Sequence, residues 1–145
     1  MTATFIANYN GPQSTTGAFN RVQQKNLREL GKSMEDKVCH YLQIQGLKLL
    51  KQNFLCSMGE IDLIMQDKDD LVFIEVRYRQ ADDYGDGIES ITAYKQKRII
   101  NAANFYLNKH RISERAGCRF DVLAVSPLQN QLKIDWIRDA FQVDY

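Results

Sequence analysis

Two stretches of the chain repeat apolar residues at spacings of three and four, the pattern of a helix with one buried face. The first runs over 28–45 and stops before Gly46, a residue that commonly follows a helix. The second runs over 92–109, where Thr92 is placed to cap the first turn. The apolar stripes that predict these helices are Leu30, Met34, Val38, Tyr41 and Leu42, and Ile99, Ile100, Ala103, Tyr106 and Leu107.

The stretch 59–79 predicts a β-hairpin, because two runs of β-favouring residues flank the polar cluster 67–70. Counting outward from this four-residue loop places Asp62 opposite Glu75, with both side chains on one face. The same count pairs Gln66 with Leu71 and Ile64 with Phe73. It also predicts an entirely apolar opposite face, made of Ile61, Leu63, Met65, Val72, Ile74 and Val76.

Other strands are predicted from short apolar or alternating runs at 47–54, 118–125 and 132–137, the last two forming a hairpin. Ser126 and Pro127 are expected to end the strand before them, because proline cannot donate a backbone hydrogen bond. A helical turn is expected at 139–141.

The order of elements is helix, three strands, helix, two strands. It predicts an α/β (α+β) fold with a mixed five-stranded sheet flanked by helices. Residues 1–26 show no sustained period and are expected to form a flexible N-terminal tail, followed by a single domain over 27–145.

Composition narrows the class of protein. The 145 residues are 44% hydrophobic and 26% charged, as is usual for a globular domain. The net charge of +1 neither requires nor excludes a nucleic-acid partner. No apolar run is long enough to span a membrane, and the first residues lack the pattern of an export signal. Three widely spaced cysteines suggest neither a disulfide framework nor a zinc pair, so a cytoplasmic protein without a membrane partner is expected.

Candidate chemistry lies on the hairpin. Two carboxylates as close as Asp62 and Glu75 repel each other unless a cation lies between them. Oxygen ligands favour Mg²⁺ or Mn²⁺, and Arg77 projects from the same strand face as Glu75. Such a group suits phosphodiester hydrolysis, in which a metal ion activates water and neutralises phosphate charge. A purely structural ion pair of Glu75 with Arg77 or Arg79 is the alternative.

These motifs resemble the YraN family (uncharacterised protein family 0102) of bacterial proteins, which is itself similar to the restriction-endonuclease-like PD-(D/E)XK nucleases. The resemblance covers about 28–141 in consistent order. The segments that carry it are GEIDLI (59–64), FIEVRYR (73–79), Gly31 to Glu35, the YL pair at 41–42, KQKRI (95–99) and CRFDV (118–122).

The resemblance implies a nuclease-like active site. Asp62 and Glu75 match its acidic metal ligands, the carbonyl of Val76 adds a third oxygen, and Glu35 matches a supporting helical acid. Arg77 stands where the nuclease motif has lysine. Arginine stays protonated in proteins, so it can clamp phosphate but cannot act as a base.

Some relatives of this fold move the lysine to a helix, and Lys95 is the candidate here. Gln96 and Arg98 on the same helix, with Arg77 and Arg79, are the expected nucleic-acid contacts. A solvated basic turn is the alternative for Lys95 and Arg98. Likewise, Glu35 could be a solvated helix residue, and Arg119 and Asp121 are expected to form an internal ion pair.

The leading hypothesis is a Mg²⁺- or Mn²⁺-dependent nuclease-like protein acting on DNA or RNA. The rival hypothesis is a non-catalytic nucleic-acid-binding module that keeps the fold with a degenerate site. Resolvase-like relatives dimerise, so a homodimer is a further expectation.

Overall fold

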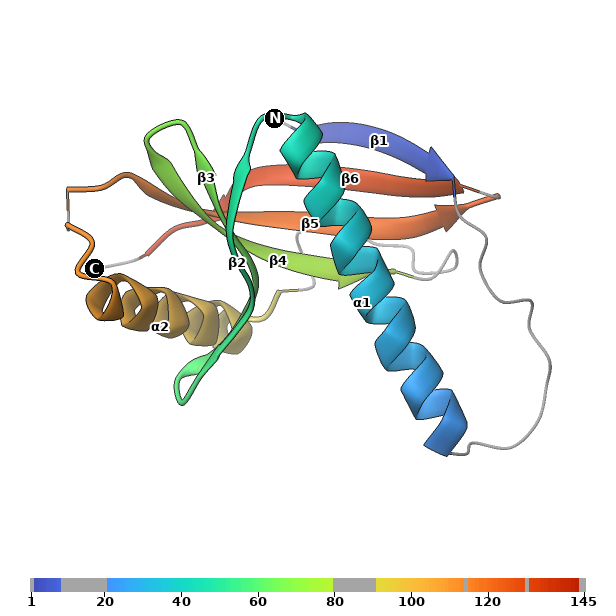
Figure 1. Cartoon of the computed structure of the whole chain (residues 1–145), viewed down its shortest axis with the longest axis horizontal. Helices are drawn as coiled ribbons and strands as arrows, with labels where there is room; N and C mark the ends of the chain where they lie inside the picture. Colours follow the sequence, from blue (N-terminus) through green and yellow to red (C-terminus); the bar gives the residue numbers. More distant parts are fainter. Residues whose placement is uncertain (1, 9–20, 80–90, 114, 130, 144–145) are drawn as a thin grey trace.

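The computed structural model describes residues 2–8, 21–79, 91–113, 115–129 and 131–143, which form one six-stranded sheet and two helices (Figure 1). The strands lie in the order β1-β6-β5-β4-β3-β2, with β4 and β5 parallel and the other neighbours antiparallel. Their bounds are β1 Thr2–Asn8, β2 Lys48–Cys56, β3 Gly59–Asp67, β4 Asp70–Tyr78, β5 Cys118–Leu128 and β6 Gln131–Phe141. The predicted α/β fold is confirmed, and β1 adds a sixth strand.

The helices α1 (Arg21–Ile44) and α2 (Ala93–Lys109) cover opposite faces of the sheet. The core cluster around α1 includes Leu63 and Val72, whereas the cluster around α2 includes Ile64 and Phe73. Because neighbouring residues in a strand point to opposite faces, the two clusters lie on the two sides of the sheet. Neither of these helices is long and apolar enough to cross a membrane.

Both predicted helices form, and their caps and apolar stripes agree with the prediction. The Thr92 hydroxyl accepts a hydrogen bond from the backbone N–H of Lys95 at 3.2 Å, which confirms the cap of α2. Gly46 has a φ of 100°, a conformation that glycine adopts readily after a helix. Helix α1 begins at Arg21 rather than near 28, since its first turns are rich in good helix formers without an apolar stripe.

The N-terminal residues differ from the expected tail. Thr2–Asn8 forms β1 and pairs with β6, with Phe5 opposite Ile134. Threonine, phenylalanine and isoleucine favour strands, but a single short edge strand gives a weak signal in the sequence. Residues 9–20, the central part of the predicted tail, lie outside the described residues.

The β3–β4 hairpin has the predicted register near its turn, confirmed by the pairs Gln66–Leu71 and Ile64–Phe73. The predicted pair of Asp62 with Glu75 is not part of the ladder, which stops one pair earlier. The loop of the hairpin is shorter than expected, because Asp67 and Asp70 also pair. Lys68 has a positive φ of 56°, as tight two-residue hairpin turns require.

The predicted apolar face is wrong at Ile61. This side chain packs with Ile64 and Phe73 on the α2 side, whereas Leu63 packs on the α1 side. The alternation of β3 is therefore broken between Ile61 and Leu63. Pairing with β4 stops at the same place, at Leu63 opposite Ile74, so β3 leaves β4 before either strand ends.

Strand β5 continues through Ser126 and Pro127, which were expected to end it. Its pairing with β4 extends only to Val125, opposite Tyr78. Beyond that point β5 has no partner on the β4 side among the described strands, so the missing N–H of proline costs little there.

The helical turn expected at 139–141 is also strand, because β6 extends to Phe141. The buried carboxylate of Asp121 holds this end by accepting the backbone N–H of Asp139 at 2.9 Å and the indole N–H of Trp136 at 3.0 Å. Arg119 donates to the same carboxylate at 3.1 Å, which confirms the expected ion pair.

Gly59 allows the start of β3 to approach α2. A Cβ atom at this position would lie 2.8 Å from the backbone oxygen of Arg98, closer than carbon and oxygen can pack. We expect Gly59→Ala to lower the free energy of unfolding by about 1–3 kcal/mol in urea titrations. Gly31 on α1 is the matched control, because nothing lies within 4 Å of its added Cβ. Gly31→Ala should stabilise the protein by about 0.5–1 kcal/mol, and equal effects of the two changes would contradict the close approach.

Candidate metal and phosphate site

The separation of β3 from β4 creates the site. Beyond the pair of Leu63 and Ile74, β4 continues to Tyr78 with β5 on one side only. Its other edge is met by the carboxylate of Asp62, which accepts the backbone N–H of Val76 at 2.8 Å. A side chain thus takes the place of a ladder partner, and this bond fixes Asp62 beside the C-terminal half of β4.

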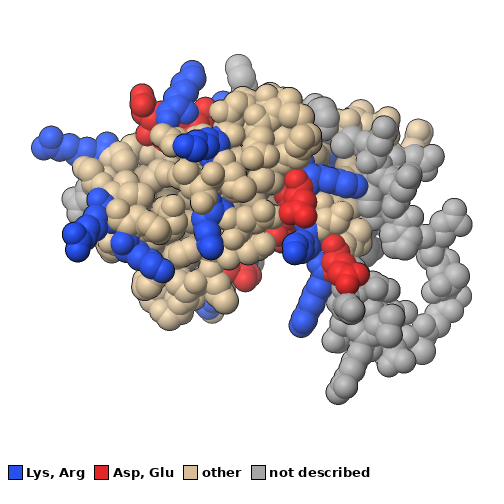
Figure 2. All heavy atoms as spheres, viewed as in Figure 1, with Lys and Arg blue, Asp and Glu red and all other residues tan. Residues whose placement is uncertain are grey.

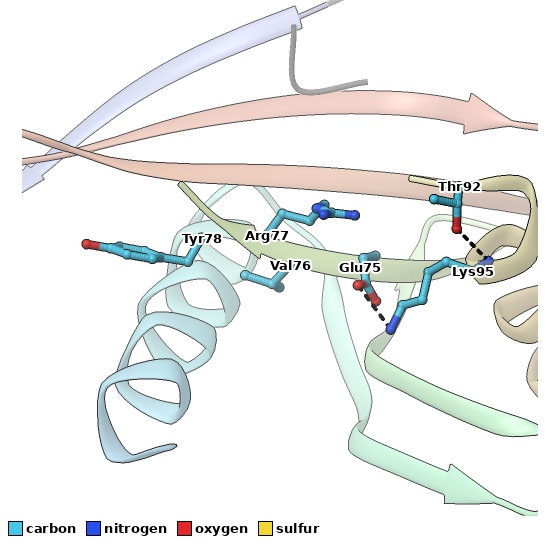
Figure 3. Close-up of a pocket in the computed structure, with 6 residues that line it drawn as sticks. All are labelled: Glu75, Val76, Arg77, Tyr78, Thr92 and Lys95. Atoms are coloured by element: carbon cyan, nitrogen blue, oxygen red, sulfur yellow. Dashed lines mark hydrogen bonds and ion pairs between the residues drawn. The ribbon is translucent and has the colours of Figure 1, made fainter. Parts of the chain in front are cut away.

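Glu75 faces α2 and is only 8% exposed. Its Oε1 lies 3.3 Å from the Nζ of Lys95, which is carried by the first turn of α2 (Figure 3). Its Oε2 is buried and accepts no hydrogen bond from any described residue. A hydrogen bond between the Glu75 and Asp62 carboxyl groups, which requires a proton on one of them, helps to raise the pKa of Glu75. When both acids are ionised, Oε2 has no donor among the described residues, which is costly for a buried carboxylate.

Burial and charge repulsion shift both acids in the same direction. Burial and the nearby Asp62 charge raise the pKa of Glu75 to about 7, although the Lys95 ammonium opposes the shift. Burial also raises the pKa of Asp62, against the lowering effects of the Val76 hydrogen bond and of Lys95. The surroundings of these two acids therefore favour their neutral forms over their ionised forms.

Glu35 reaches the edge of this pair from α1. Burial raises the pKa of Glu35, and the Asp62 charge raises it further, whereas a hydrogen bond with Asn53 lowers it. The expected placement of a helical acid near Asp62 thus agrees with the electrostatics. Asn53 has a φ of 51° within β2, a left-handed conformation that asparagine tolerates better than most residues.

A recess of about 450 Å³ follows the open edge of β4. Figure 3 shows the Glu75 carboxylate and the Lys95 ammonium facing each other at one end, while Tyr78 extends at the other end and Arg77 lies between. The residues that line the recess are Glu75, Val76, Arg77, Tyr78, Thr92 and Lys95. Two cationic side chains and a buried acid on one wall suit an anionic ligand that approaches together with a metal ion.

The predicted nucleic-acid contacts are only partly brought together. Arg77 and Lys95 line the recess, but Gln96 is not among its lining residues. Gln96 donates instead to the carbonyl of Ile91 at 3.1 Å, which explains a polar side chain on the inner part of α2. The guanidinium of Arg98 donates to the Tyr94 hydroxyl at 3.5 Å. Arg98 and Arg79, like Gln96, are not among the lining residues.

Glu60 is a neighbour of the site that the sequence analysis did not single out. Its Oε1 lies 3.7 Å from the Nζ of Lys95, so this ammonium contacts acids of two strands. The sequence signal was available, because Glu60 precedes Asp62 by two residues and alternation would place them on one face.

The metal-ligand set offered by the chain is small. No group of three or more His, Cys, Asp or Glu side chains in the described part of the chain is arranged to hold a metal ion. Asp62 and Glu75 are the pair that lies together, and Val76 lines the recess next to Glu75. Mg²⁺ commonly takes one or two carboxylates and keeps several waters, so a pair of acids suffices for this ion. The unfilled Glu75 oxygen fits such a ligand.

Positive charge is scattered over the face of the molecule that Figure 2 shows. On the face shown in Figure 2, Lys and Arg side chains stand apart, with uncharged surface and acidic side chains between them.

The fold and the site define a mixed α/β protein with paired carboxylates at an open strand edge. Residues 34–125 match the Uncharacterised protein family UPF0102. A UPF0102 protein of Nitrosococcus oceani is 48% identical over 117 residues, which cover 81% of this chain and 94% of that relative. One from Coxiella burnetii is 42% identical over 118 residues, covering 81% and 96%. The chain belongs to the UPF0102 family, which confirms the family resemblance.

The raised pKa of Glu75 predicts a pH-dependent stability in the presence of a chelator. Because the folded-state pKa is near 7 rather than 4.5, the folded protein retains a proton that the unfolded chain releases between these values. Stability from this group is complete below pH 4.5 and is lost as the pH rises through about 7. We expect Glu75→Gln to raise the free energy of unfolding at pH 8, relative to its effect at pH 5, by on the order of 2 kcal/mol.

Glu60→Gln is the control for this measurement. Glu60 also contacts Lys95, but its side chain is 62% exposed, so it should give parallel stability curves at the two pH values. Parallel curves for Glu75→Gln as well would contradict the placement of this carboxyl group in a buried, like-charged environment.

Proposed function

We propose that this protein is a Mg²⁺- or Mn²⁺-dependent nuclease-like enzyme that hydrolyses phosphodiester bonds in nucleic acid. The proposal is carried by one observation. Asp62 and Glu75 converge at an open strand edge, and a buried Glu75 oxygen there lacks a partner. Burial and the neighbouring Asp62 charge raise the pKa of Glu75 to about 7, and a divalent ion would stabilise both acids in their ionised forms.

The chain's own residues would divide the work as follows. Asp62 and Glu75 would hold the ion, with the Val76 carbonyl as a further oxygen ligand implied by the nuclease-like resemblance. A bound ion would polarise the phosphate and lower the pKa of a bound water. Arg77 would bind a non-bridging phosphate oxygen, since a guanidinium matches phosphate geometry. Its position on the recess wall supports this role.

Lys95 would not bind the ion but would contact a water molecule or the substrate directly. Its ammonium lies 3.3 Å from Glu75 and 3.7 Å from Glu60, so it can shift toward Glu60 when another cation neutralises Glu75. From there it can donate a hydrogen bond to a water or a phosphate oxygen in the recess. Glu35, whose pKa responds to Asp62, would orient water at the outer side of the acid pair.

Substitution of Asp62 tests the proposal. Asp62→Asn keeps an oxygen that can accept the Val76 N–H, so the hairpin should still fold, but it removes a ligand charge. We expect the wild type to cleave at least one of a panel of single-stranded, duplex and branched DNA and RNA with Mg²⁺ or Mn²⁺. Asp62→Asn should lower that rate by about 100-fold or more, because several kcal/mol of charge stabilisation are lost.

Asp69→Asn is the matched control, since Asp69 is exposed at the β3–β4 turn, away from the recess. It should retain the wild-type rate. Metal-dependent cleavage that survives Asp62→Asn, or no cleavage of any substrate by the wild type, would contradict the proposed chemistry.

A non-catalytic nucleic-acid-binding module is the second candidate, and the Lys95 contact favours it. The ammonium already provides a counter-charge to Glu75 without a metal ion. Arg77, which cannot act as a base, also suits binding better than catalysis. Nucleic-acid binding that is equal in the wild type and in Asp62→Asn, without cleavage by either, would support this candidate. A homodimer stays a prediction, which sedimentation velocity can check.

A further inference from the structure

An exposed tyrosine stands at the rim of the recess. Tyr78 is the last residue of β4, is 43% exposed and lines the recess together with Arg77. In Figure 3 its ring extends away from β4 at the end opposite Lys95. An exposed aromatic side chain that lines the rim of the recess and belongs to neither core cluster is well placed to stack on a base.

The burial of the Glu75 carboxylate limits which ligands can reach it. Glu75 is 8% exposed, and its carboxylate lies at the Lys95 end of a recess of about 450 Å³. A phosphodiester must reach this recess to meet Glu75. Duplex nucleic acid is stiff over distances of about 150 bp, and its bases are stacked on each other, so they present no free face to Tyr78. An unpaired strand can bend its backbone inward and turn a base outward.

The distribution of charge also favours unpaired nucleic acid over duplex as the ligand. Proteins that bind duplex through its backbone depend on many Lys and Arg contacts with phosphates. This chain has a net charge of +1, and the positive side chains visible in Figure 2 stand apart from one another. Stacking adds sequence-tolerant affinity to the contacts with the phosphate backbone, and it acts on unpaired bases.

We infer that the substrate is unpaired nucleic acid, either a single strand or an unpaired segment, with one base stacked on Tyr78 and the adjoining phosphate beside Arg77. This inference rests on the proposed function, because it identifies the substrate class of the same recess. DNA and RNA share the chemistry that is recognised, a base face and a phosphodiester.

Fluorescence anisotropy with short labelled oligonucleotides tests the inference. The probes are oligo(dT), oligo(U) and a closed DNA hairpin duplex with the same number of phosphates, each measured in chelator and in Ca²⁺. We expect the single strands to bind about tenfold or more tightly than the duplex. Tyr78→Ala should weaken single-strand binding by about tenfold, the loss that removal of one stacked base brings, while Tyr78→Phe retains it.

Phe105→Ala is the matched control. Phe105 is 41% exposed, close to the value for Tyr78, but it follows Lys95 by ten residues on α2, about 15 Å along the helix. It should leave binding unchanged, and thermal melting of every variant checks that each is folded. Equal affinity for single strand and duplex, or equal losses for Tyr78→Ala and Phe105→Ala, would overturn the inference. An affinity difference between oligo(dT) and oligo(U) would identify which nucleic acid is preferred.

The two proposals can fail separately. Single-strand binding that depends on Tyr78 but is never followed by metal-dependent cleavage would remove the enzymatic proposal and leave the ligand class. Cleavage that requires Asp62 but does not depend on Tyr78, and that is equally fast on single strands and duplex, would support the enzymatic proposal and overturn the inferred ligand class.

Discussion

The hydrogen bond from the backbone N–H of Val76 to the Asp62 carboxylate is the interaction on which the site depends. It forms where β3 leaves β4, and it satisfies a donor that the departing strand would otherwise leave open. The same bond places Asp62 beside Glu75. The edge that opens beyond it becomes the recess, so the local loss of sheet pairing and the gathering of charge have one structural origin.

This arrangement places Glu75 in an energetically unfavourable environment. Its carboxylate is buried beside a second acid, and Lys95 compensates the charge at only one of its two oxygens. Functional sites commonly retain such poorly compensated groups because a ligand later completes them. Helix α2 has a central part in this, since the Thr92 cap fixes its first turn and thereby the base of the Lys95 side chain.

Much of this arrangement could be predicted from the sequence, and the exceptions have physical reasons. Counting predicts the hairpin register correctly as far as Leu63 opposite Ile74. The expected ladder pair of Asp62 with Glu75 does not form, because β3 has left β4 at that point, and Asp62 comes near Glu75 through its bond to the Val76 N–H. The break in alternation at Ile61 was not predictable, because an apolar residue suits either face of a sheet that is covered on both sides. The sequence does not predict strand β1 or the extension of β6, because both depend on partners that are distant in sequence. An example is the Asp121 carboxylate, which accepts the backbone N–H of Asp139.

Carbon-13 NMR titration of the side-chain carboxyl groups tests the central claim most directly. In chelator, the account predicts that Glu75 titrates near pH 7, since burial and Asp62 raise its pKa to about 7. Saturating Mg²⁺ should move this titration below about pH 5, because a bound cation favours the ionised form. A Glu75 that titrates near the ordinary value of about 4.3, with no response to Mg²⁺, would contradict the account.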